Sequence, residues 1–421
     1  MQEDYLQFLW QNKKVIPNQL FLVDGRELII EDVGWLNSFS GPDFFNGSVI
    51  IDGIKWSGNI EIHINSSDWY NHKHHLDRSY DNVVLHVVLK HDKEVNVQGR
   101  TLPTLELQNH IEYNHYESYL KLHKSLGEIP CHKSISSVSN EVFQKQLDIS
   151  FFQRLQNKAL DLFGNDKSNH PKEILFAALI QAIGGKVNKH PFQELSKRLN
   201  FRIIEQIKWN QNLLEALFFG ISGFLSLPIE DAYQKQLHMD WQFLKHKYKL
   251  SEMQVSTWKF GGVRPPNFPS FRIAQLVILV KNWNFLISED SSSDMVLENL
   301  KQSLQLPDKH IYWSYHYSFG KISKQHLFKL SKPTKELLII NGILPYLVYL
   351  HQTTEKMGYL DLVEELAEIL TAEKNSITKK FSSHGVKFSN AKSTQGALEL
   401  YDSLCKNKNC LRCEIGGYLL G

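Results

Sequence analysis

The stretch GPDFFNGSVIIDGIKWSGNIEIHINSSDWYNHKHH, residues 41–75, decides how the first part of the chain folds, and it holds the densest group of reactive side chains. Apolar and polar residues alternate along NIEIHI, which is typical of a β-strand, and Asp and Gly separate this run from the apolar run SVII. The pattern predicts a β-hairpin. Residues two apart in a strand share a face, so Glu61 and His63 are expected on one face and their isoleucine neighbours on the other.

Further alternating runs, ELIIEDVG, NVVLHVVLK and LPTLEL, predict a mixed sheet around this hairpin, with a short amphipathic helix over residues 5–14. His86, within VVLHVVL, is expected to be a hydrogen-bonded sheet residue. From Ser136 onward apolar residues recur at helical spacing, as in NEVFQKQLDISFFQRLQNKALDLF and SFRIAQLVILVKNW. We therefore predict an α+β domain over residues 1–135 and a large all-α domain over residues 136–421.

Composition favours a folded protein, with 42% hydrophobic and 12% aromatic residues. The formal net charge is only +2, from 47 basic and 45 acidic side chains, so charge alone does not indicate a nucleic-acid partner. No run approaches the roughly 20 apolar residues of a membrane span, and acids stand where a signal peptide needs basic residues. We expect a cytoplasmic protein without a membrane partner, and the low cysteine content agrees with a reducing compartment.

Asp43, Glu61 and His63 form the candidate catalytic group. Two carboxylates beside a third polar group suit a hard divalent cation, Mg²⁺ or Mn²⁺, that activates water against a phosphodiester. His72 and His74 are candidate further metal ligands, because neutral imidazoles bind Zn²⁺, Mn²⁺ and Fe²⁺ well. The alternative is that Asp43 caps a turn and that the histidines lie on a solvated loop.

The order helix, strand, Pro-Asp, hairpin, Glu-x-His, then helix or loop and another strand resembles the PD-(D/E)XK nuclease core. This resemblance implies a restriction-endonuclease-like mixed sheet, with Asp43 and Glu61 as metal ligands. In that superfamily a Lys two residues after the Glu orients the attacking water, and His63 stands at that position here. An imidazole can act as base or ligand, but it lacks the ammonium charge that stabilises hydroxide, so a degenerate, inactive core is the alternative.

Several separated motifs resemble the DUF2851 family of uncharacterised bacterial proteins. They are GPDF, GNIEIH, SDWYNHKHH and YDNVVLHVV, followed much later by WKFGGVRPPNFPSFRIAQL and CLRCEIGGYLL. The motifs are spread over nearly the whole chain. The resemblance implies one architecture and a cytoplasmic bacterial setting, and it carries no assigned activity.

Two loops in the helical part are candidates for binding substrate. In WKFGGVRPPNFPSFRIAQL, a proline-rich loop leading into a helix offers Arg264, Asn267 and Arg272 to a phosphate or carboxylate. In AIGGKVNKHPF, a glycine turn between two helices offers Lys186 and Asn188, as helix-hairpin-helix modules do to DNA phosphates. The alternative is that both loops only lock helices together, with glycine as a helix cap.

The C-terminal segment CKNKNCLRC places Cys405, Cys410 and Cys413 at the spacing C-x₄-C-x₂-C. Three thiolates so spaced can surround one metal or cluster, and Cys131 is the fourth cysteine of the chain. An iron–sulfur cluster would resemble that of the iron-staple nucleases, whose spacing differs, and zinc held with His132 or another histidine is the competing site. Buried free cysteines are the third alternative.

These features favour a metal-dependent nuclease or phosphodiesterase acting on DNA or RNA. The first alternative is a non-catalytic nucleic-acid-binding or scaffolding protein that keeps a degenerate nuclease-like core. The second is a metal hydrolase for a small substrate, with the Arg264 loop holding an anion. The pattern leaves the oligomeric state open.

Overall fold

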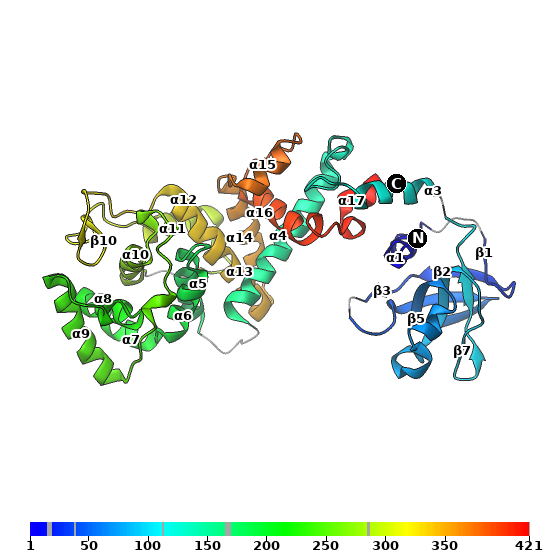
Figure 1. The fold of residues 1–421 in the computed structure, drawn as a ribbon, viewed down its shortest axis with the longest axis horizontal. Coiled ribbons are helices and arrows are strands. Elements are labelled where there is room, and N and C mark those ends of the chain that lie inside the picture. Colours follow the sequence, from blue (N-terminus) through cyan, green and yellow to red (C-terminus); the bar gives the residue numbers. More distant parts are fainter. Residues whose placement is uncertain (15–18, 38, 112, 165–169, 284–286, 421) are drawn as a thin grey trace. The chain divides into compact units, whose positions relative to one another are not determined.

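The computed structural model describes residues 1–14, 19–37, 39–111, 113–164, 170–283 and 287–420. The chain divides into two compact units (Figure 1): Met1–Gln146 with Leu400–Gly421 form unit 1, and Leu147–Glu399 form unit 2. Unit 1 contains a mixed sheet with helices, and unit 2 is largely helical. The predicted succession of an α+β part and a large helical part is thereby confirmed, while the C-terminal tail joins unit 1.

Unit 1 is built on a seven-stranded mixed sheet. Its strands are β1 (Leu20–Phe21), β2 (Glu27–Asp32), β3 (Trp35–Leu36), β4 (Phe44–Ile51), β5 (Ile54–Asn65), β6 (Val83–Lys90) and β9 (Thr104–Glu106). The order is β1-β2-β4-β5-β6-β9, with β3 attached to β4. Pairs up to β5 are antiparallel, whereas β6 runs parallel to both β5 and β9. A separate ribbon pairs β7 (Asn96–Val97) with β8 (Arg100–Thr101).

The central β4–β5 hairpin turns at Asp52 and Gly53, whose φ angles are 47° and 79°. Positive φ at both positions is what a two-residue hairpin loop of this twist requires, which explains the Asp-Gly pair. A bulge interrupts the pairing between Phe44 and Gly47. A Cβ atom on Gly47 would lie 2.5 Å from Ile60 Cδ1, so glycine here leaves room for that buried side chain.

The apolar core of unit 1 includes side chains of β5 and of helix α1 (Glu3–Gln11). Ile60 and Ile62 are fully buried in this core, as the alternation in β5 predicts, together with Tyr5 and Trp10 of α1. The same strand buries Glu61 and His63. Strand β5 therefore has little exposed surface at its centre, and its polar residues lie among other polar groups.

The connection from β5 to β6 is a short crossover that consists of α2 (Asp68–Asn71) and the 3₁₀ turns η1 (His74–Leu76) and η2 (Arg78–Tyr80). Trp69 is fully buried and packs with Tyr80 in a small core of its own. Ser66 and Ser67 at its start bind Asp92 beyond β6, with Ser67 Oγ 2.8 Å from Asp92 Oδ2. The crossover is thus held down at both ends, and it carries His72 and His74.

The remaining helices of unit 1 are α3 (Tyr113–His123), which the sequence did not predict, η3 (Ile135–Ser137) and the start of α4 (Asn140–Phe163), which continues into unit 2. The tail adds η8 (Leu400–Cys405), η9 (Cys410–Arg412) and α17 (Glu414–Leu419). Cys410 and Leu420 are buried in the unit 1 core, and the Glu414 N–H donates to Gln146 Oε1 at 2.7 Å. These contacts explain why the tail belongs to unit 1.

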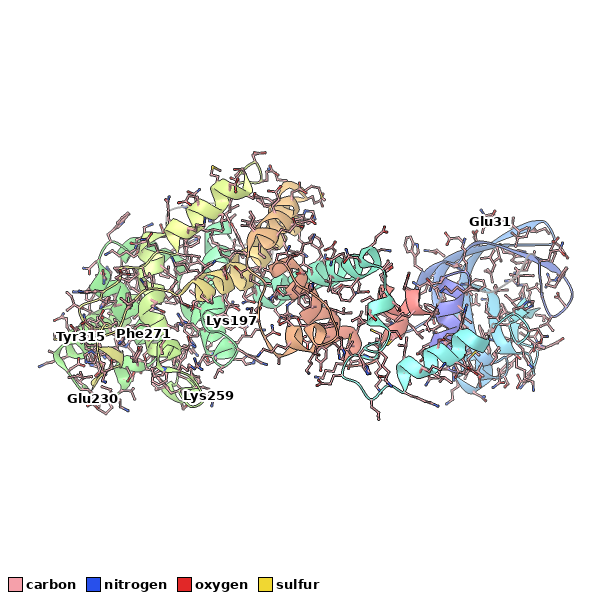
Figure 2. All side chains as sticks on the ribbon, turned by 90° about the horizontal axis from the view of Figure 1, so that it is seen from above. Glu31, Lys197, Glu230, Lys259, Phe271 and Tyr315 are labelled. Atoms are coloured by element: carbon pink, nitrogen blue, oxygen red, sulfur yellow. The ribbon has the colours of Figure 1, made fainter. Side chains whose placement is uncertain are left out.

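Unit 2 is a helical assembly around α10, whose residues from Pro269 to Val280 are all buried. Phe271, labelled in Figure 2, packs edge-on against Tyr317 of strand β10. The helices of unit 2 are the rest of α4, α5 (Pro171–Ile183), α6 (Lys189–Arg198), α7 (Phe201–Ile207), α8 (Gln211–Ile221), α9 (Ala232–Tyr248), α10 (Pro269–Asn282), α11 (Ser293–Ser303), α12 (Lys332–Leu338), α13 (Leu344–Thr354), α14 (Gly358–Ile369), α15 (Ser376–Ser382) and α16 (Ala391–Glu399). Its short 3₁₀ turns are η4 (Phe224–Ser226), η5 (Val255–Thr257) and η6 (Pro265–Asn267). A two-stranded ribbon pairs β10 (His316–Ser318) with β11 (Lys321–Ile322).

A π-helical turn, η7 (Ile339–Ile343), joins α12 and α13. Pro345 lies two residues beyond it and has no N–H to donate to this turn, which agrees with the wider spacing. Within the described ranges, no helix is long and apolar enough to cross a membrane.

Replacing Ile62 by Ala should lower the free energy of unfolding by about 2–5 kcal/mol, because it leaves a cavity in the buried core of unit 1. Ile29→Ala is the matched control, since Ile29 in β2 is 52% exposed and its loss should cost less than about 1 kcal/mol. Urea denaturation followed by circular dichroism measures both. Equal midpoints for the two variants would contradict the packing described for β5.

Candidate functional site

Asp43, directly before β4, and Glu61, in β5, are held together by the backbone of the hairpin. The Asp43 N–H donates to Glu61 Oε2 at 3.0 Å, and the Ile62 N–H donates to Asp43 Oδ2 at 2.9 Å. Gln7 of α1 donates from Nε2 to Asp43 Oδ1 at 2.9 Å. Each carboxyl group is therefore fixed by the segment that carries the other, so their position follows from the register of the hairpin.

Glu61 is buried, Asp43 is half-buried, and the side chain of Glu3 in α1, near both, is 36% exposed. Burial raises the pKa of Glu61 to about 8. Burial, with repulsion from Glu61, raises the pKa of Asp43 to about 7. Burial, with repulsion from Asp43 and Glu61, raises the pKa of Glu3 to about 7. Near neutral pH such a group of acids is stabilised either by bound protons or by a cation.

Three histidines converge on the same place. The ligand nitrogens of His63, His72 and His74 all lie within 4.8 Å of one another. His72 Nδ1 lies 3.2 Å from His63 Nε2, and the rings of His63 and His74 stack. Burial and the neighbouring histidines lower the pKa of His63 to about 2, so its imidazole is neutral. His75 is not part of this group, because its ring lies against Tyr70.

Glu61 Oε1 is the oxygen that the histidines share. It lies 3.5 Å from His63 Nε2 and 3.2 Å from His74 Nε2. The second distance suits a hydrogen bond, yet His74 Nε2 has no hydrogen-bond partner among the described residues, so the angle is unsuitable. Glu3 Oε1 lies 3.9 Å from His63 Nε2 on another side. Ligand atoms that are close without pointing at each other are arranged as they would be around a common cation.

His86 of β6 contacts His63 through a pair of ring nitrogens. His63 Nδ1 and His86 Nε2 are 2.8 Å apart, so one of them donates a proton to the other. If His63 donates from Nδ1, its Nε2 presents a lone pair to Glu61 and His72, which is how a second partner orients a metal-binding imidazole. Burial lowers the pKa of His86 to about 3, so this pair is neutral. The His/carboxylate cluster therefore comprises seven side chains: Glu3, Asp43, Glu61, His63, His72, His74 and His86.

The His/carboxylate cluster opens to the surface through His72 and His74. Both line an open depression of about 680 Å³. Its lining includes two cations, Lys73 and Arg78, one carboxylate, Asp77, and the aromatic ring of Phe39, which is 89% exposed. The two cations and the exposed ring suit an anionic ligand with an aromatic base.

The substrate-binding candidates lie in unit 2, and three of them, Arg272, Asn267 and Asn188, are used internally. Arg272 is buried and donates to Asn267 Oδ1 at 2.6 Å and to Gln275 Oε1 at 2.8 Å. Asn188 is buried and both donates to and accepts from the backbone of Lys259 at 2.9 Å. These groups connect one loop to another.

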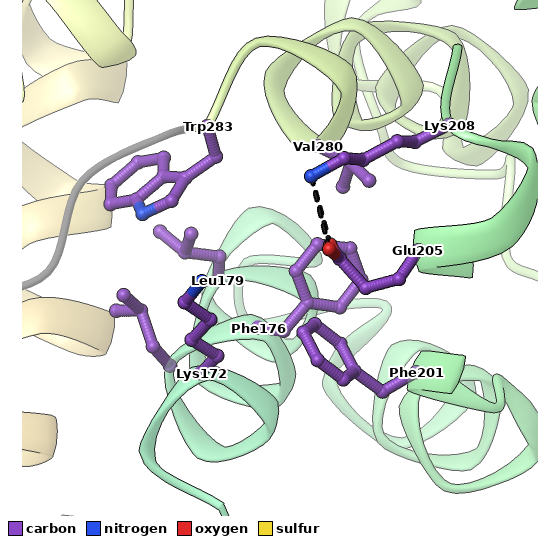
Figure 3. A pocket seen from close by; sticks show the side chains of 9 residues that line it. Lys172, Phe176, Leu179, Phe201, Glu205, Lys208, Val280 and Trp283 are labelled. Atoms are coloured by element: carbon purple, nitrogen blue, oxygen red, sulfur yellow. Dashed lines mark hydrogen bonds and ion pairs between the residues drawn. The ribbon is translucent and has the colours of Figure 1, made fainter. Parts of the chain in front are cut away.

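Arg264 and Lys186 are exposed. A small pocket of unit 2, about 100 Å³, with both apolar and charged lining residues, lies elsewhere in the unit (Figure 3). Its lining comes from α5, α7 and α10, and an ion pair of 3.0 Å joins Lys208 and Glu205 at its edge. None of the described candidate residues lines this pocket, so it adds nothing to the candidate site.

Sequence reasoning missed Glu3 and Gln7, and it gave His86 only a structural place. Nothing local marks Glu3, because its role depends on where α1 packs. His86 offers a weak signal, a polar residue inside an apolar strand. The parallel pairing that sets Glu61 opposite His86 is a tertiary feature.

The protein is thus an α+β chain with a buried His/carboxylate cluster, followed by a helical unit. A family model described as "Protein of unknown function (DUF2851)" matches residues 3–376, and the chain belongs to this family. The matched range includes the whole His/carboxylate cluster and Cys131 and ends before Cys405. Comparison with curated proteins gave no match, and comparison with solved structures gave none either.

In the presence of a chelator, the thermal stability of unit 1 should fall as the pH rises. The pKa of Glu61 is raised from 4.5 to about 8 by folding, so its contribution is complete below pH 4.5 and is lost as the pH passes 8. Glu61→Gln removes this ionisation and should melt several degrees above wild type at alkaline pH, a difference on the order of a few kcal/mol. Differential scanning fluorimetry across pH measures it.

Glu31→Gln is the matched control for this experiment. Glu31 lies in β2, is labelled in Figure 2, and pairs with Lys55 Nζ at 2.6 Å outside the His/carboxylate cluster. It should keep the wild-type dependence on pH. If Glu61→Gln and wild type lose stability in parallel, burial of the Glu61 charge is not the cause.

Proposed function

We propose that this protein is a metal-dependent phosphodiester hydrolase that cleaves nucleic acid. The observation that carries the proposal is the pair of half-buried Asp43 and buried Glu61 beside three converging imidazoles, next to a depression lined by Lys73, Arg78 and Asp77. The reaction adds water to phosphorus, and the ester oxygen leaves with a proton as an alcohol. The products are a phosphomonoester end and a hydroxyl end.

The donor set fits a divalent transition metal. Glu61, His63, His72 and His74 would hold it, with Asp43 or Glu3 completing the set. Three imidazoles with carboxylate oxygens favour Mn²⁺, Fe²⁺ or Zn²⁺ over Mg²⁺, which prefers oxygen ligands and water. When bound, such an ion supplies Lewis-acid stabilisation of the phosphate and lowers the pKa of water.

The proposed likeness assigns the first part of unit 1 to the PD-(D/E)XK core. Helix α1, strand β2, Pro-Asp, the β4–β5 hairpin with Glu-x-His, the short crossover and β6 come in that order, with the short strands β1 and β3 among them. Antiparallel pairing of β4 with β5 brings Asp43 and Glu61 to one place. On this proposal His63 replaces the usual lysine.

With histidine in place of lysine, residue 63 has a different proposed role. His63 is a poor proton acceptor, since burial lowers its pKa to about 2, so it serves as a neutral ligand oriented by His86. The positive charge that a lysine would supply must come from elsewhere. Lys73 and Arg78 at the rim are placed to hold a phosphate, and Phe39 to stack on a base.

Purified protein with Mn²⁺ should cleave single-stranded or double-stranded DNA or RNA, and Glu61→Gln should lower the rate at least about 100-fold, as removal of one charge-stabilising group does. Glu31→Gln should cleave like wild type. The rate constants are measured with end-labelled oligonucleotides under single-turnover conditions, together with Mn²⁺ affinity by calorimetry.

The other outcomes separate the alternatives. Binding of nucleic acid without cleavage, unaffected by Glu61→Gln, would leave a degenerate core that only binds. Cleavage that persists in Glu61→Gln would place the active site elsewhere. Hydrolysis of a small chromogenic phosphodiester but of no polymer would favour the small-substrate hydrolase.

The double variant Lys73→Ala with Arg78→Ala should weaken nucleic-acid binding without weakening Mn²⁺ binding, because both residues lie on the rim and not in the His/carboxylate cluster. The slope of log affinity against log salt should fall by roughly 0.7–0.9 for each phosphate that the variant no longer neutralises. Fluorescence anisotropy at several salt concentrations measures it. Lys55→Ala, an exposed lysine of the same unit, is the control.

A further inference from the structure

The fold gathers all four cysteines of the chain in unit 1. Cys131 lies in the turns after α3, Cys405 ends η8, Cys410 begins η9, and Cys413 precedes α17. All four are free thiols. The C-terminal three are separated from Cys131 by more than half the chain, so the fold and not sequence proximity brings them together.

Each thiol is close enough to every other for their charges to interact. A charge on Cys413, Cys131 or Cys410 raises the pKa of the Cys405 thiol. In the same way, a charge on Cys413 or Cys410 raises the pKa of Cys131, and a charge on Cys413 raises the pKa of Cys410. These interactions cover every pair of the four, which defines a single four-thiol group.

The thiols are nevertheless too far apart to share one ion as they stand. A zinc–sulfur distance of about 2.3 Å in a tetrahedron puts the sulfurs about 3.8 Å apart. Among the described residues, the one group of three or more ligand atoms lying mutually within 4.8 Å is that of the histidines. A polynuclear cluster has a separate iron for its thiolates and accepts wider sulfur spacing.

The surroundings suit a cluster. Cys410 is buried in the core of unit 1, and Cys131 and Leu411 pack against that core. Cys405 is buried as well. Cys413 is the N-cap of α17, so the Ile415 and Gly416 amides at the start of that helix lie near its sulfur, as amides do around iron–sulfur clusters.

Gly416 shows how closely the tail is packed around these sulfurs. A Cβ atom at this position would lie 1.9 Å from the Cys410 carbonyl oxygen. The backbone of α17 can therefore approach η9 only because residue 416 is glycine.

We propose that the four cysteines bind an iron–sulfur cluster that fastens the C-terminal tail to the rest of unit 1. The spacing C-x₄-C-x₂-C with a distant fourth cysteine is one that such clusters use. On transfer of a preassembled cluster that carries small thiolate ligands, each cysteine thiol forms one iron–sulfur bond as the bond from that iron to its small thiolate breaks. The departing thiolate takes the cysteine's proton, and no electron is transferred. The site is separate from the His/carboxylate cluster and does not depend on the proposed hydrolysis.

Full-length protein purified without oxygen should contain iron and acid-labile sulfide in equal amounts, about two or four of each per chain, with visible charge-transfer absorption. Cys405→Ser, Cys413→Ser and Cys131→Ser should each lose most of the iron. Lys406→Ala, an exposed neighbour of Cys405, should keep it. Glu61→Gln should also keep it, which separates this site from the proposed hydrolase.

Metal and sulfide analysis of the wild type decides the question even where a serine variant fails to fold. About one zinc per chain without sulfide would overturn the cluster in favour of a zinc site. Protein that is purified without iron is incubated with a preformed iron–sulfur cluster that carries small thiolate ligands. Four thiols that still react with Ellman's reagent, with no iron retained, would overturn the proposal as well.

Discussion

Unit 1 depends on keeping two acidic side chains together where there is little water. Asp43 and Glu61 are held there by a reciprocal pair of hydrogen bonds, each from the backbone beside the partner. A shift of the hairpin by one residue would turn the polar side chains of β5 into the apolar core, so the isoleucines and the acids fix the same register. The raised pKa values of both carboxyl groups record the energetic cost. Groups that repel one another in this way are stabilised near neutral pH by bound protons or by a cation.

The direction of the strands then decides which histidines reach these acids. Because β6 runs parallel to β5, the chain must return along the sheet before β6 begins, and the crossover 66–82 does this. A buried Trp69 holds the crossover in place. His72 and His74 are therefore brought back to Glu61, although their sequence looks like that of a solvated loop. Parallel register also places His86 beside His63.

Local patterns predicted the sheet, most long helices and the shared face of Glu61 and His63, because those features depend on residues a few positions apart. They did not predict helix α3, whose Tyr- and His-rich sequence lacks a clear apolar stripe. The part played by Glu3 depends on tertiary packing. Arg272 and Asn188 looked available for a ligand because their partners, Gln275 and the Lys259 backbone, cannot be recognised from the loops alone. Polar residues in rigid loops are recognised as structural only when their partners are known.

The return of the tail to unit 1 has a consequence for how the protein is made. In the sequence, unit 2 is inserted between the two segments of unit 1, since Leu147–Glu399 separate the sheet from η8, η9 and α17. A ribosome therefore releases the sheet long before the segment that completes its core. Unit 1 has to wait, with Cys131 and part of its apolar surface uncovered, until unit 2 has emerged. Only a chain translated past Cys413 can finish both units, so an interrupted product would be left with an open core that proteases can recognise.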